Sequence, residues 1–540
     1  MLPKLLPFLL GILVSSEFSF AETHSSDVVS LPYGKFRGSL NGNVTQFLGV
    51  RYGHSERFRL PADPIPFDGV HNATAYGPFC PIQAIPSLGG EPAPPPDPSI
   101  SEDCLTLDII KPSVRTSRRL PVFIYIYGGG FNIGKSSDND LKPLVERSIE
   151  RGEPIIGITI NHRTTAFGFL PGKEVADAGI SNLGLRDQIF ALKWIKNHIS
   201  AFGGDPSRVI LGGQSSGSVS TSYLTLDNKQ NSNSLFHGAF MQSGTVVRSP
   251  PQSEGQADYD ALVNTLNCAA AQDTLDCLRT VPFDSFMAAV NNTRSQALYN
   301  TFDIAWQPRI DGDVIVQNAW TSIRDGAYAK FPILSPICDD EGTIVVLPLL
   351  NITTTEELVG YLRSYLLQNA SPAQVRELVN LYPDDPAQGS PFGTGLDFQI
   401  APEYKRIASL IGDLELISPR RFFLQHASPR QNVWGSLSKL GKTTEFGAYH
   451  TSDTPVWFTN TTVVGYMGMD ALLNFVNRLD PNSPSAKVFW PKWNSPSKEG
   501  NTSLLTFSDS GTVNITADNF REEGMALLNF LHANEFLGVL

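Results

Sequence analysis

The 540-residue sequence has few cysteines and no excess of basic charge. It contains five cysteines, and its 41 lysines and arginines are outnumbered by 53 acidic residues, for a net charge of −12. No cluster of basic residues stands out against this background, so a nucleic-acid partner is not expected. The chain also contains no internal repeat and no long glycine-serine or charged linker. We therefore expect one large α/β domain rather than several domains.

Long apolar runs are equally scarce, and the run at the N-terminus is short. Residues 1–21 contain an early lysine, an apolar run from Leu5 to Val14, and small residues at Ser19 and Ala21. This pattern is typical of a secretory signal peptide, since the run is too short to span a membrane. We predict cleavage after Ala21, a single domain over residues 22–540 and an extracellular location. The alternative, a retained membrane anchor, is disfavoured because no second apolar span follows.

Two further patterns fit secretion. The five cysteines allow 15 ways to form two bridges. Sequence nearness favours Cys80 with Cys104 and Cys268 with Cys277, because each pair closes a short loop, and it leaves Cys338 as a buried free thiol at a strand end. The chain also contains eight Asn-x-Ser/Thr glycosylation candidates, most of which we expect on exposed loops: Asn43, Asn72, Asn291, Asn351, Asn369, Asn460, Asn501 and Asn514.

One short run organises the rest of the chain. Residues 209–211 predict a buried central strand, which ends in Gly213-Gln-Ser215-Ser-Gly217 before a helix over 218–224. A serine on such a strand-to-helix turn has a strained backbone and an exposed hydroxyl, and the flanking glycines avoid collisions with neighbouring elements. The five-residue pattern is weak evidence alone, but its setting predicts that Ser215 is a nucleophile.

A glycine-rich loop comes before this turn. A strand over 122–126 leads into Tyr127-Gly128-Gly129-Gly130-Phe131, where adjacent glycines leave backbone N–H groups open to a negatively charged oxygen. A strand over 155–160 and a helix over 184–199 follow. This order predicts a large, mostly parallel central sheet with helices on both faces and a site at the carboxyl ends of its strands.

A serine nucleophile needs a base, and the base needs an acceptor that fixes its tautomer. In folds of this kind the chain order is serine, acid, histidine, which leaves His426, His450 and His532. Two of these histidines stand in predicted helices, whereas His450 stands in a loop just after a glycine. His450 is therefore the predicted base.

The acid should lie between Ser215 and His450, just after a strand. A strand is predicted over 331–337, and Asp339, Asp340 and Glu341 follow it. Local physical arguments do not separate these three acids, and spacing alone gives Glu341 only a modest lead.

Ten ordered motifs run through nearly the whole chain, from about Val28 to beyond Trp493. They are Ser101-Glu-Asp-Cys-Leu105, Tyr127-Gly-Gly-Gly-Phe131, Asn161 with Arg163 and Phe167-Gly-Phe-Leu170, Asn182-Leu-Gly-Leu185, Asp187-Gln188, Phe202-Gly-Gly-Asp-Pro206, Gly213-Gln-Ser-Ser-Gly217, Gln242-Ser-Gly244, Asp340-Glu-Gly-Thr343 and Gly447-Ala-Tyr-His450. Together these motifs resemble the type-B carboxylesterase/lipase family, the cholinesterase-like branch of the α/β-hydrolases. The likeness is greatest to secreted fungal lipases and esterases.

The resemblance implies an α/β-hydrolase fold and hydrolysis of carboxylic esters without a cofactor or a metal. It implies Ser215 as nucleophile, Glu341 as acid and His450 as base, with Ser243 supporting Glu341. It also implies the two disulfides that sequence nearness favours. The backbone donors implied for the oxyanion are those of Gly129, Gly130 and Ser216.

Two departures from the family pattern bear on the substrate. The family commonly has glutamate just before the nucleophile, but this chain has Gln214, whose neutral amide offers no charge to a choline ester. The segment between Cys80 and Cys104 contains seven prolines and no aromatic residue, so it has no ring face for a quaternary ammonium. That segment is the lid in related fungal lipases, and its short, proline-rich form predicts weak or no interfacial activation.

These observations predict a secreted serine hydrolase that cleaves a small-molecule or lipid ester through an acyl-enzyme, with no stable membrane anchor. Two alternatives remain open. One is a true triacylglycerol or sterol-ester lipase, and the other is a non-catalytic adhesion or binding module of the same fold. Nothing in the sequence points to a particular oligomeric state.

Overall fold

A computed structural model describes residues 28–84, 99–114, 116–295, 298–484, 486–495 and 500–534. The predicted signal peptide lies outside these residues, as does most of the proline-rich segment that follows Cys80. The predictions of cleavage after Ala21 and of weak interfacial activation therefore stay predictions.

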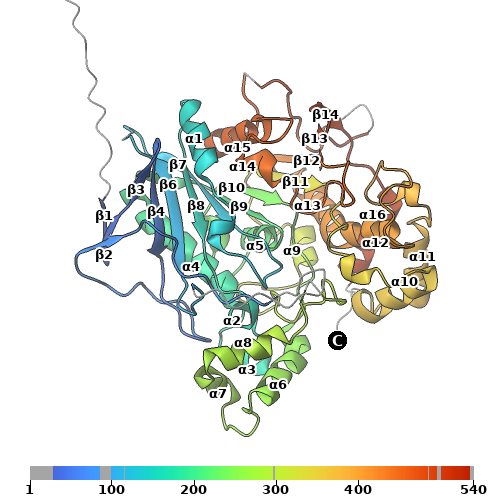
Figure 1. Ribbon diagram of the computed structural model, residues 1–540, viewed down its shortest axis with the longest axis horizontal. Helices are drawn as coiled ribbons and strands as arrows, with labels where there is room; N and C mark the ends of the chain where they lie inside the picture. The colour runs from blue at the N-terminus through green and yellow to red at the C-terminus, as the bar shows by residue number, and fades with distance from the viewer. Residues whose placement is uncertain are drawn as a thin grey trace, which may run out of the picture.

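One large sheet forms the centre of the molecule (Figure 1). Its strands are β3 (Ser39–Asn41), β4 (Val44–Arg51), β6 (Thr106–Pro112), β7 (Leu120–Ile126), β8 (Ile156–Ile160), β9 (Gly204–Gln214), β10 (Gly238–Gln242), β11 (Ile333–Cys338), β12 (Val433–Lys439), β13 (Leu504–Ser508) and β14 (Val513–Thr516). Across the described residues, the order of these eleven strands is β14-β13-β12-β11-β10-β9-β7-β8-β6-β4-β3. The strands from β13 to β8 in this order run parallel, and antiparallel strands close both edges. The predicted mostly parallel sheet is confirmed.

Both faces of the sheet are buried, which explains the continuous apolar run in β7. Val122, Ile124 and Ile126 point into one core, whereas Phe123 and Tyr125 point into the core on the other face. Alternate residues of a strand face opposite sides, so a strand covered on both sides has no polar positions.

Helices cover the two faces of the sheet. One face carries α1 (Lys142–Glu150), α14 (Thr454–Phe458) and α15 (Met467–Arg478), whose apolar residues join Phe123 and Tyr125. The other face carries α4 (Leu183–His198), α5 (Ser216–Thr225), α9 (Ala319–Asp325) and α13 (Ser418–Ala427). The helices predicted over 184–199 and 218–224 are thus present as α4 and α5.

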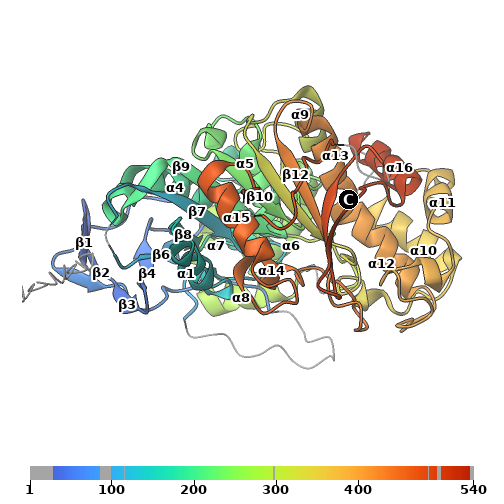
Figure 2. The ribbon, with the colours of Figure 1, turned by 90° about the horizontal axis from the view of Figure 1, so that it is seen from above.

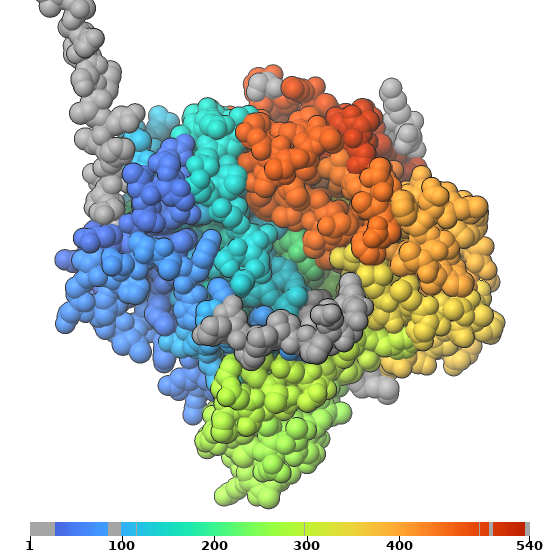
Figure 3. All heavy atoms as spheres, viewed as in Figure 1, coloured from blue at the N-terminus to red at the C-terminus, as the bar shows by residue number. Residues whose placement is uncertain are grey.

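The remaining helices form two projections beside the sheet. The green one in Figures 1 and 3 contains α3 (Lys173–Asp177), α6 (Gln256–Thr265), α7 (Thr274–Thr280) and α8 (Phe283–Asn291), with α2 (Thr165–Phe169) next to it. The yellow to red one contains α10 (Thr355–Tyr361), α11 (Pro372–Asn380), α12 (Tyr404–Gly412) and α16 (Glu522–Ala533), which share a third apolar core. Figure 2 shows this group at one end of the sheet. A separate small sheet contains β1 (Val28–Leu31), β2 (Gly34–Arg37) and β5 (Val70–Asn72).

Both predicted disulfides are present. Cys80 and Cys104 are bridged with a Cα–Cα distance of 5.0 Å, and Cys268 and Cys277 with one of 5.7 Å. Cys338 is free and buried at the last residue of β11. Burial raises the pKa of its thiol well above the usual range. A neutral, packed thiol is a poor nucleophile, in keeping with a structural role for this cysteine.

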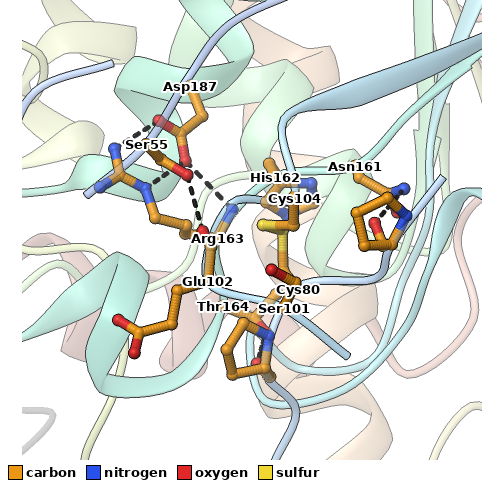
Figure 4. Close-up of a disulfide and its surroundings, with 12 residues drawn as sticks. Ser55, Cys80, Ser101, Glu102, Cys104, Asn161, His162, Arg163, Thr164 and Asp187 are labelled. Carbon is orange, nitrogen blue, oxygen red and sulfur yellow. Dashed lines mark hydrogen bonds and ion pairs between the residues drawn. A yellow bond between two sulfur atoms is a disulfide. The ribbon is translucent and has the colours of Figure 1, made fainter. Parts of the chain in front are cut away.

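A buried ion pair lies beside the first disulfide (Figure 4). The Arg163 guanidinium donates to both carboxylate oxygens of Asp187, at 2.8 and 2.6 Å, and its backbone N–H donates to the same carboxylate at 3.1 Å. Both side chains are almost inaccessible to solvent. The pair joins the start of α4 to the segment after β8, so it fixes the elements that surround the glycine-rich loop.

All eight glycosylation candidates are exposed. Five lie in turns or loops, as predicted, but Asn72 is in β5, Asn514 is in β14 and Asn291 ends α8. Exposure is required for modification, and glycosylation itself stays a prediction.

A second buried charge cluster stabilises the other half of the molecule. Asp518 accepts hydrogen bonds from Arg420 at 2.8 Å, from Arg421 at 2.6 Å and from the Trp493 indole at 2.8 Å. Although burial alone would raise the pKa of Asp518, the two guanidiniums hold it well below its usual value. The carboxylate is therefore charged in the folded protein and neutralises two buried cations.

We expect Asp518→Ala to lower the free energy of unfolding by about 3–5 kcal/mol, because it leaves two buried guanidiniums without their counter-charge. Denaturant unfolding of purified protein measures this loss. Asp384→Ala, which removes an exposed carboxylate, is the matched control and should change stability by less than about 0.5 kcal/mol. Equal stabilities of the two variants would contradict the prediction.

Candidate active site

Ser215 stands on the sharp turn between β9 and α5. Its backbone has φ 53° and ψ −125°, a conformation that residues with a side chain rarely adopt. A Cβ on Gly213 would collide with the backbone of Gly217, and a Cβ on Gly217 would collide with the carbonyl oxygen of Ile126 in the neighbouring strand β7. Close packing of β7, β9 and α5 therefore requires both glycines, and it holds the serine in its strained position.

The structure brings Ser215, Glu341 and His450 together. The Nε2 atom of His450 lies 2.9 Å from the Ser215 hydroxyl oxygen, and its Nδ1 atom lies 2.6 Å from Oε2 of Glu341. Glu341 and His450 are 1% and 8% exposed. The carboxylate fixes the tautomer, since it accepts a hydrogen bond from the Nδ1–H group and leaves Nε2 free to accept the serine proton. This is the geometry that an alcohol nucleophile requires.

The sequence left three acids open, and the structure separates them. Glu341 faces His450, and its other oxygen accepts a hydrogen bond of 2.7 Å from the backbone N–H of Cys338. Asp339 and Asp340 instead form ion pairs with Lys442. Of the three acids, only Glu341 is therefore in position to orient the histidine.

Asp340 holds the loop that carries His450. Its carboxylate accepts hydrogen bonds from the backbone N–H of Ala448 and of Phe392, each at 2.8 Å, and its own N–H donates to the Ala448 carbonyl at 2.9 Å. Sequence reasoning missed this role for Asp340 and Lys442. The position of Asp340 next to Glu341 in the sequence could have indicated this role. No sequence pattern indicated a role for Lys442.

The glycine-rich loop after β7 adopts left-handed backbone conformations, with φ 113° at Gly129 and φ 60° at Gly130. A Cβ on Gly129 would collide with the carbonyl oxygen of Ile133. Within the described residues, the amides of Gly129, Gly130 and Ser216 donate to no other group. The Ser216 amide also begins α5, where the helix dipole favours negative charge. These amides are free to stabilise an oxyanion at Ser215.

Gln214 and Ser243 are the two residues that the sequence placed next to the three central side chains. The Nε2 atom of Gln214 lies 3.2 Å from Nε2 of His450, so this amide contacts the histidine directly. The predicted support of Glu341 by Ser243 is not a hydrogen bond from the Ser243 side chain, because its buried hydroxyl has no hydrogen-bond partner among the described residues. The backbone N–H of Cys338 and the ring of His450 bind the Glu341 oxygens instead.

A cavity of about 120 Å³ opens beside Ser215. Its wall includes Gly130, Phe131, Ser216 and Val219, together with the charged or polar residues Arg248, Asp303, Gln307, Glu415 and His532. A larger hollow of about 500 Å³ lies between α1 and α15, but its wall contains no member of the Ser215 group. The residues that line the smaller cavity, rather than its volume, therefore identify it as the candidate site.

Comparison with known proteins identifies the family. Residues 25–522 match the family model described as the carboxylesterase family. The chain belongs to the carboxylesterase family. This carboxylesterase is 34% identical to a secreted triacylglycerol lipase of Gibberella zeae, over 94% of its own length and 90% of the relative. It is also 34% identical to Lipase 4 of Diutina rugosa, over 93% and 95% of the two chains.

Solved structures agree with this assignment. The carboxylesterase superposes on EstA of Aspergillus niger with a TM-score of 0.79 and 25% identity, over 94% of its own chain and 98% of that chain. The predicted α/β-hydrolase fold is therefore confirmed, and the protein is a carboxylic ester hydrolase. In the part of the chain that the structure describes, no helix is long and apolar enough to cross a membrane.

Proposed function

We propose that this carboxylesterase is a secreted serine hydrolase that cleaves esters of short acyl chains through an acyl-enzyme on Ser215. The observation that carries the proposal is the pair of distances around His450, 2.9 Å to the Ser215 hydroxyl and 2.6 Å to the Glu341 carboxylate. Two neighbouring features support it. Amides without another acceptor lie beside the serine, and a small cavity opens next to it.

The mechanism follows from the proton positions. His450 accepts the Ser215 proton at Nε2 while the serine oxygen attacks the ester carbonyl carbon. The developing oxyanion accepts hydrogen bonds from the amides of Gly129, Gly130 and Ser216. The imidazolium then donates its proton to the departing alcohol. Water then attacks the acyl-enzyme in the same way, with His450 as the base. This second step releases the carboxylic acid and restores the Ser215 hydroxyl.

Glu341 stabilises the imidazolium without taking its proton. It is buried and accepts from both the His450 ring and the Cys338 amide, so it cannot rotate away from the ring. Gln214 adds a neutral amide next to Nε2 of His450 and brings no second negative charge to that side of the ring. This disfavours cationic choline esters as substrates.

The size of the cavity supports an esterase over a long-chain lipase. A volume of about 120 Å³ lies below the roughly 300–1,000 Å³ of typical small-molecule pockets. The lipase names of the fungal relatives favour the alternative, hydrolysis of triacylglycerols. Secretion is supported by the names of two relatives, which are called secreted lipases, and by the two disulfides.

A ladder of p-nitrophenyl esters from acetate to hexadecanoate, together with a triolein emulsion, tests the proposal. We expect kcat/KM to peak between butanoate and octanoate and to fall at least about a hundredfold for hexadecanoate, because a chain longer than the cavity forfeits apolar contacts worth about 1–3 kcal/mol per methylene. We also expect the tributyrin rate to show no jump at its solubility limit. A maximum at the longest chain, or fast cleavage of triolein, would establish the lipase alternative.

A further inference from the structure

The cavity beside Ser215 receives side chains from two unusual helical segments. η6 (Leu362–Leu366) and η8 (Asp413–Ile417) are π-helical turns that continue α10 and α12. The first contributes Tyr365 and Leu366 to the cavity wall, and the second contributes Glu415 and Leu416. Single π-helical turns are rare and occur often at functional sites, because the wider turn changes the direction of the side chains that it carries.

The two acids of η8 have different surroundings. Asp413 is fully buried and paired, since it accepts hydrogen bonds from Arg521 at 2.6 and 2.7 Å and from the Tyr382 hydroxyl at 2.9 Å. Glu415 lines the cavity and makes no hydrogen bond or ion pair with another described residue. A carboxyl group that serves the fold is paired like Asp413, so the unpaired Glu415 is available to a ligand.

The surroundings of the half-buried Glu415 favour its protonated form. Burial raises the pKa of its carboxyl group to about 8, and the charge of Arg248 opposes this rise only in part. Arg248 also binds Glu254, at 2.9 Å. Asp303, another acid of the cavity wall, is paired with Arg294 at 2.5 Å. Glu415 therefore offers the cavity an O–H donor.

His532 closes the same end of the cavity. Its Nε2 atom donates to the Leu414 carbonyl at 3.0 Å, so Nδ1 is the unprotonated nitrogen, and Nδ1 has no partner among the described residues. Burial lowers the pKa of His532 to about 3, and its ring stacks on Trp320 at a centroid distance of 4.6 Å. The histidine is thus a neutral acceptor held in a fixed orientation.

Beyond this end lies a second cavity, of about 190 Å³, whose wall also includes Arg248 and His532. The two residues therefore stand between the cavities and form a polar boundary to the space beside Ser215. An apolar chain that reached this boundary would meet polar atoms that it cannot satisfy.

The acyl group is the part of the ester that enters this cavity. The departing alcohol must lie next to His450, which protonates it, and His450 is not part of the cavity wall. The wall contains Gly130 and Ser216, whose amides bind the carbonyl oxygen in the proposed mechanism. The chain attached to that carbonyl therefore enters the cavity whose wall includes Glu415.

We propose that Glu415, with His532 and Arg248, forms a polar subsite that binds a neutral oxygen atom, of a hydroxyl or ether group, near the far end of the substrate acyl chain. This inference rests on the proposed acyl-enzyme mechanism at Ser215 and adds the class of acyl group. Glu415 donates a hydrogen bond to that oxygen, and His532 is a neutral part of the same wall. The subsite selects oxygenated short acyl groups over plain alkanoyl groups of equal length.

Matched pairs of p-nitrophenyl esters test the subsite. The pairs are 3-methoxypropanoate with pentanoate, 4-methoxybutanoate with hexanoate, and 5-methoxypentanoate with heptanoate, so that an ether oxygen replaces one methylene at constant length. Each kcat/KM is divided by the rate of hydroxide hydrolysis of the same ester, which removes the intrinsic effect of the oxygen. We expect a roughly two- to tenfold preference for the ether in at least one pair, the ratio that corresponds to one neutral hydrogen bond.

Two variants identify Glu415 as the source of this preference. Glu415→Met removes the donor at nearly constant length and should abolish or reverse the preference, whereas Glu415→Gln keeps an N–H donor and should retain it. In the unsubstituted protein the preference should fall as pH rises through about 8, because the carboxylate has no proton to donate, and in Glu415→Gln it should not change with pH. Glu377→Met, the same change at an exposed residue outside the cavity wall, is the matched control and should leave the ratio unaltered.

The outcomes separate this inference from the proposed function. Equal normalised rates within every pair, or a preference that survives Glu415→Met, would overturn the subsite while hydrolysis itself continued. Absence of hydrolysis for all six esters would overturn the proposed function instead. If Glu415→Met does not fold, the loss of the pH dependence in Glu415→Gln still decides the role of Glu415.

Discussion

Replacing Ser215 by alanine is expected to lower kcat by about 10⁴- to 10⁶-fold while the protein stays folded. The hydroxyl oxygen is the atom that forms the acyl-enzyme, so no other group can take its place. The remaining activity comes from the free amides and from substrate binding, which can still assist direct attack by water. Hydrolysis of p-nitrophenyl butanoate, with the melting temperature as a test of folding, measures the effect.

Ser222→Ala is the matched control for this variant. Ser222 is also buried in α5, where its hydroxyl donates to the Val219 carbonyl at 2.8 Å, and it takes no part in the cavity wall. It should keep kcat within about threefold of the unsubstituted value, since only one intrahelical hydrogen bond is lost. Near-normal hydrolysis by Ser215→Ala would remove the acyl-enzyme proposal.

Labelling with a fluorophosphonate distinguishes an enzyme from a non-catalytic binding module of the same fold. The reagent bonds to a serine only where a neighbouring base activates it. We therefore expect one label per chain on Ser215 and none on the alanine variant. A protein that stays unlabelled at Ser215 would favour the binding-module alternative.

Replacing Glu341 by glutamine should lower kcat by about 10³- to 10⁴-fold with little change in KM. The amide oxygen can still accept from the Cys338 N–H, so the side chain keeps its place. Its NH₂ group then faces Nδ1 of His450, which favours the tautomer with the proton on Nε2. That tautomer cannot accept the Ser215 proton, and the imidazolium also loses its counter-charge.

Glu445→Gln is the control for the loss of one negative charge on the same loop. Glu445 is exposed and lies five residues before the histidine. This variant should keep kcat within about twofold, because an exposed charge is screened by water. If the Glu341→Gln variant retained activity within tenfold of the unsubstituted protein while remaining folded, Glu341 would not be the orienting acid.

Much of the scaffold could be predicted from local patterns. The segments that form β7 and β9 are continuously apolar, whereas a strand with one face in solvent alternates apolar and polar residues. Their sequence therefore predicted a sheet that is covered on both faces. The glycines around Ser215 marked the sharp turn, because only glycine tolerates such close packing. The comparisons confirm the resulting fold class and the family.

The details of the site depended on contacts between distant segments. Three acids follow β11, and the way the chain leaves that strand decides that Glu341 faces His450 while Asp340 turns to the histidine loop. The Ser243 hydroxyl has no partner among the described residues, whereas the Cys338 amide binds Glu341. Which side chain contacts which partner depends here on the direction in which the backbone leaves a strand. The local sequence does not specify that direction.

By itself, the sequence determined the sharp turn at Ser215, the order of strands and helices around it, and the choice of His450 as the proposed base, because each of these leaves a local pattern in glycine placement, apolar runs or chain order. Only the tertiary structure decided what the cavity beside Ser215 contains. Arg248, Glu415 and His532 come from three distant segments, and the π-helical turn that presents Glu415 has no residue signature. The polarity of that cavity arises from packing, which brings together side chains that no local pattern connects.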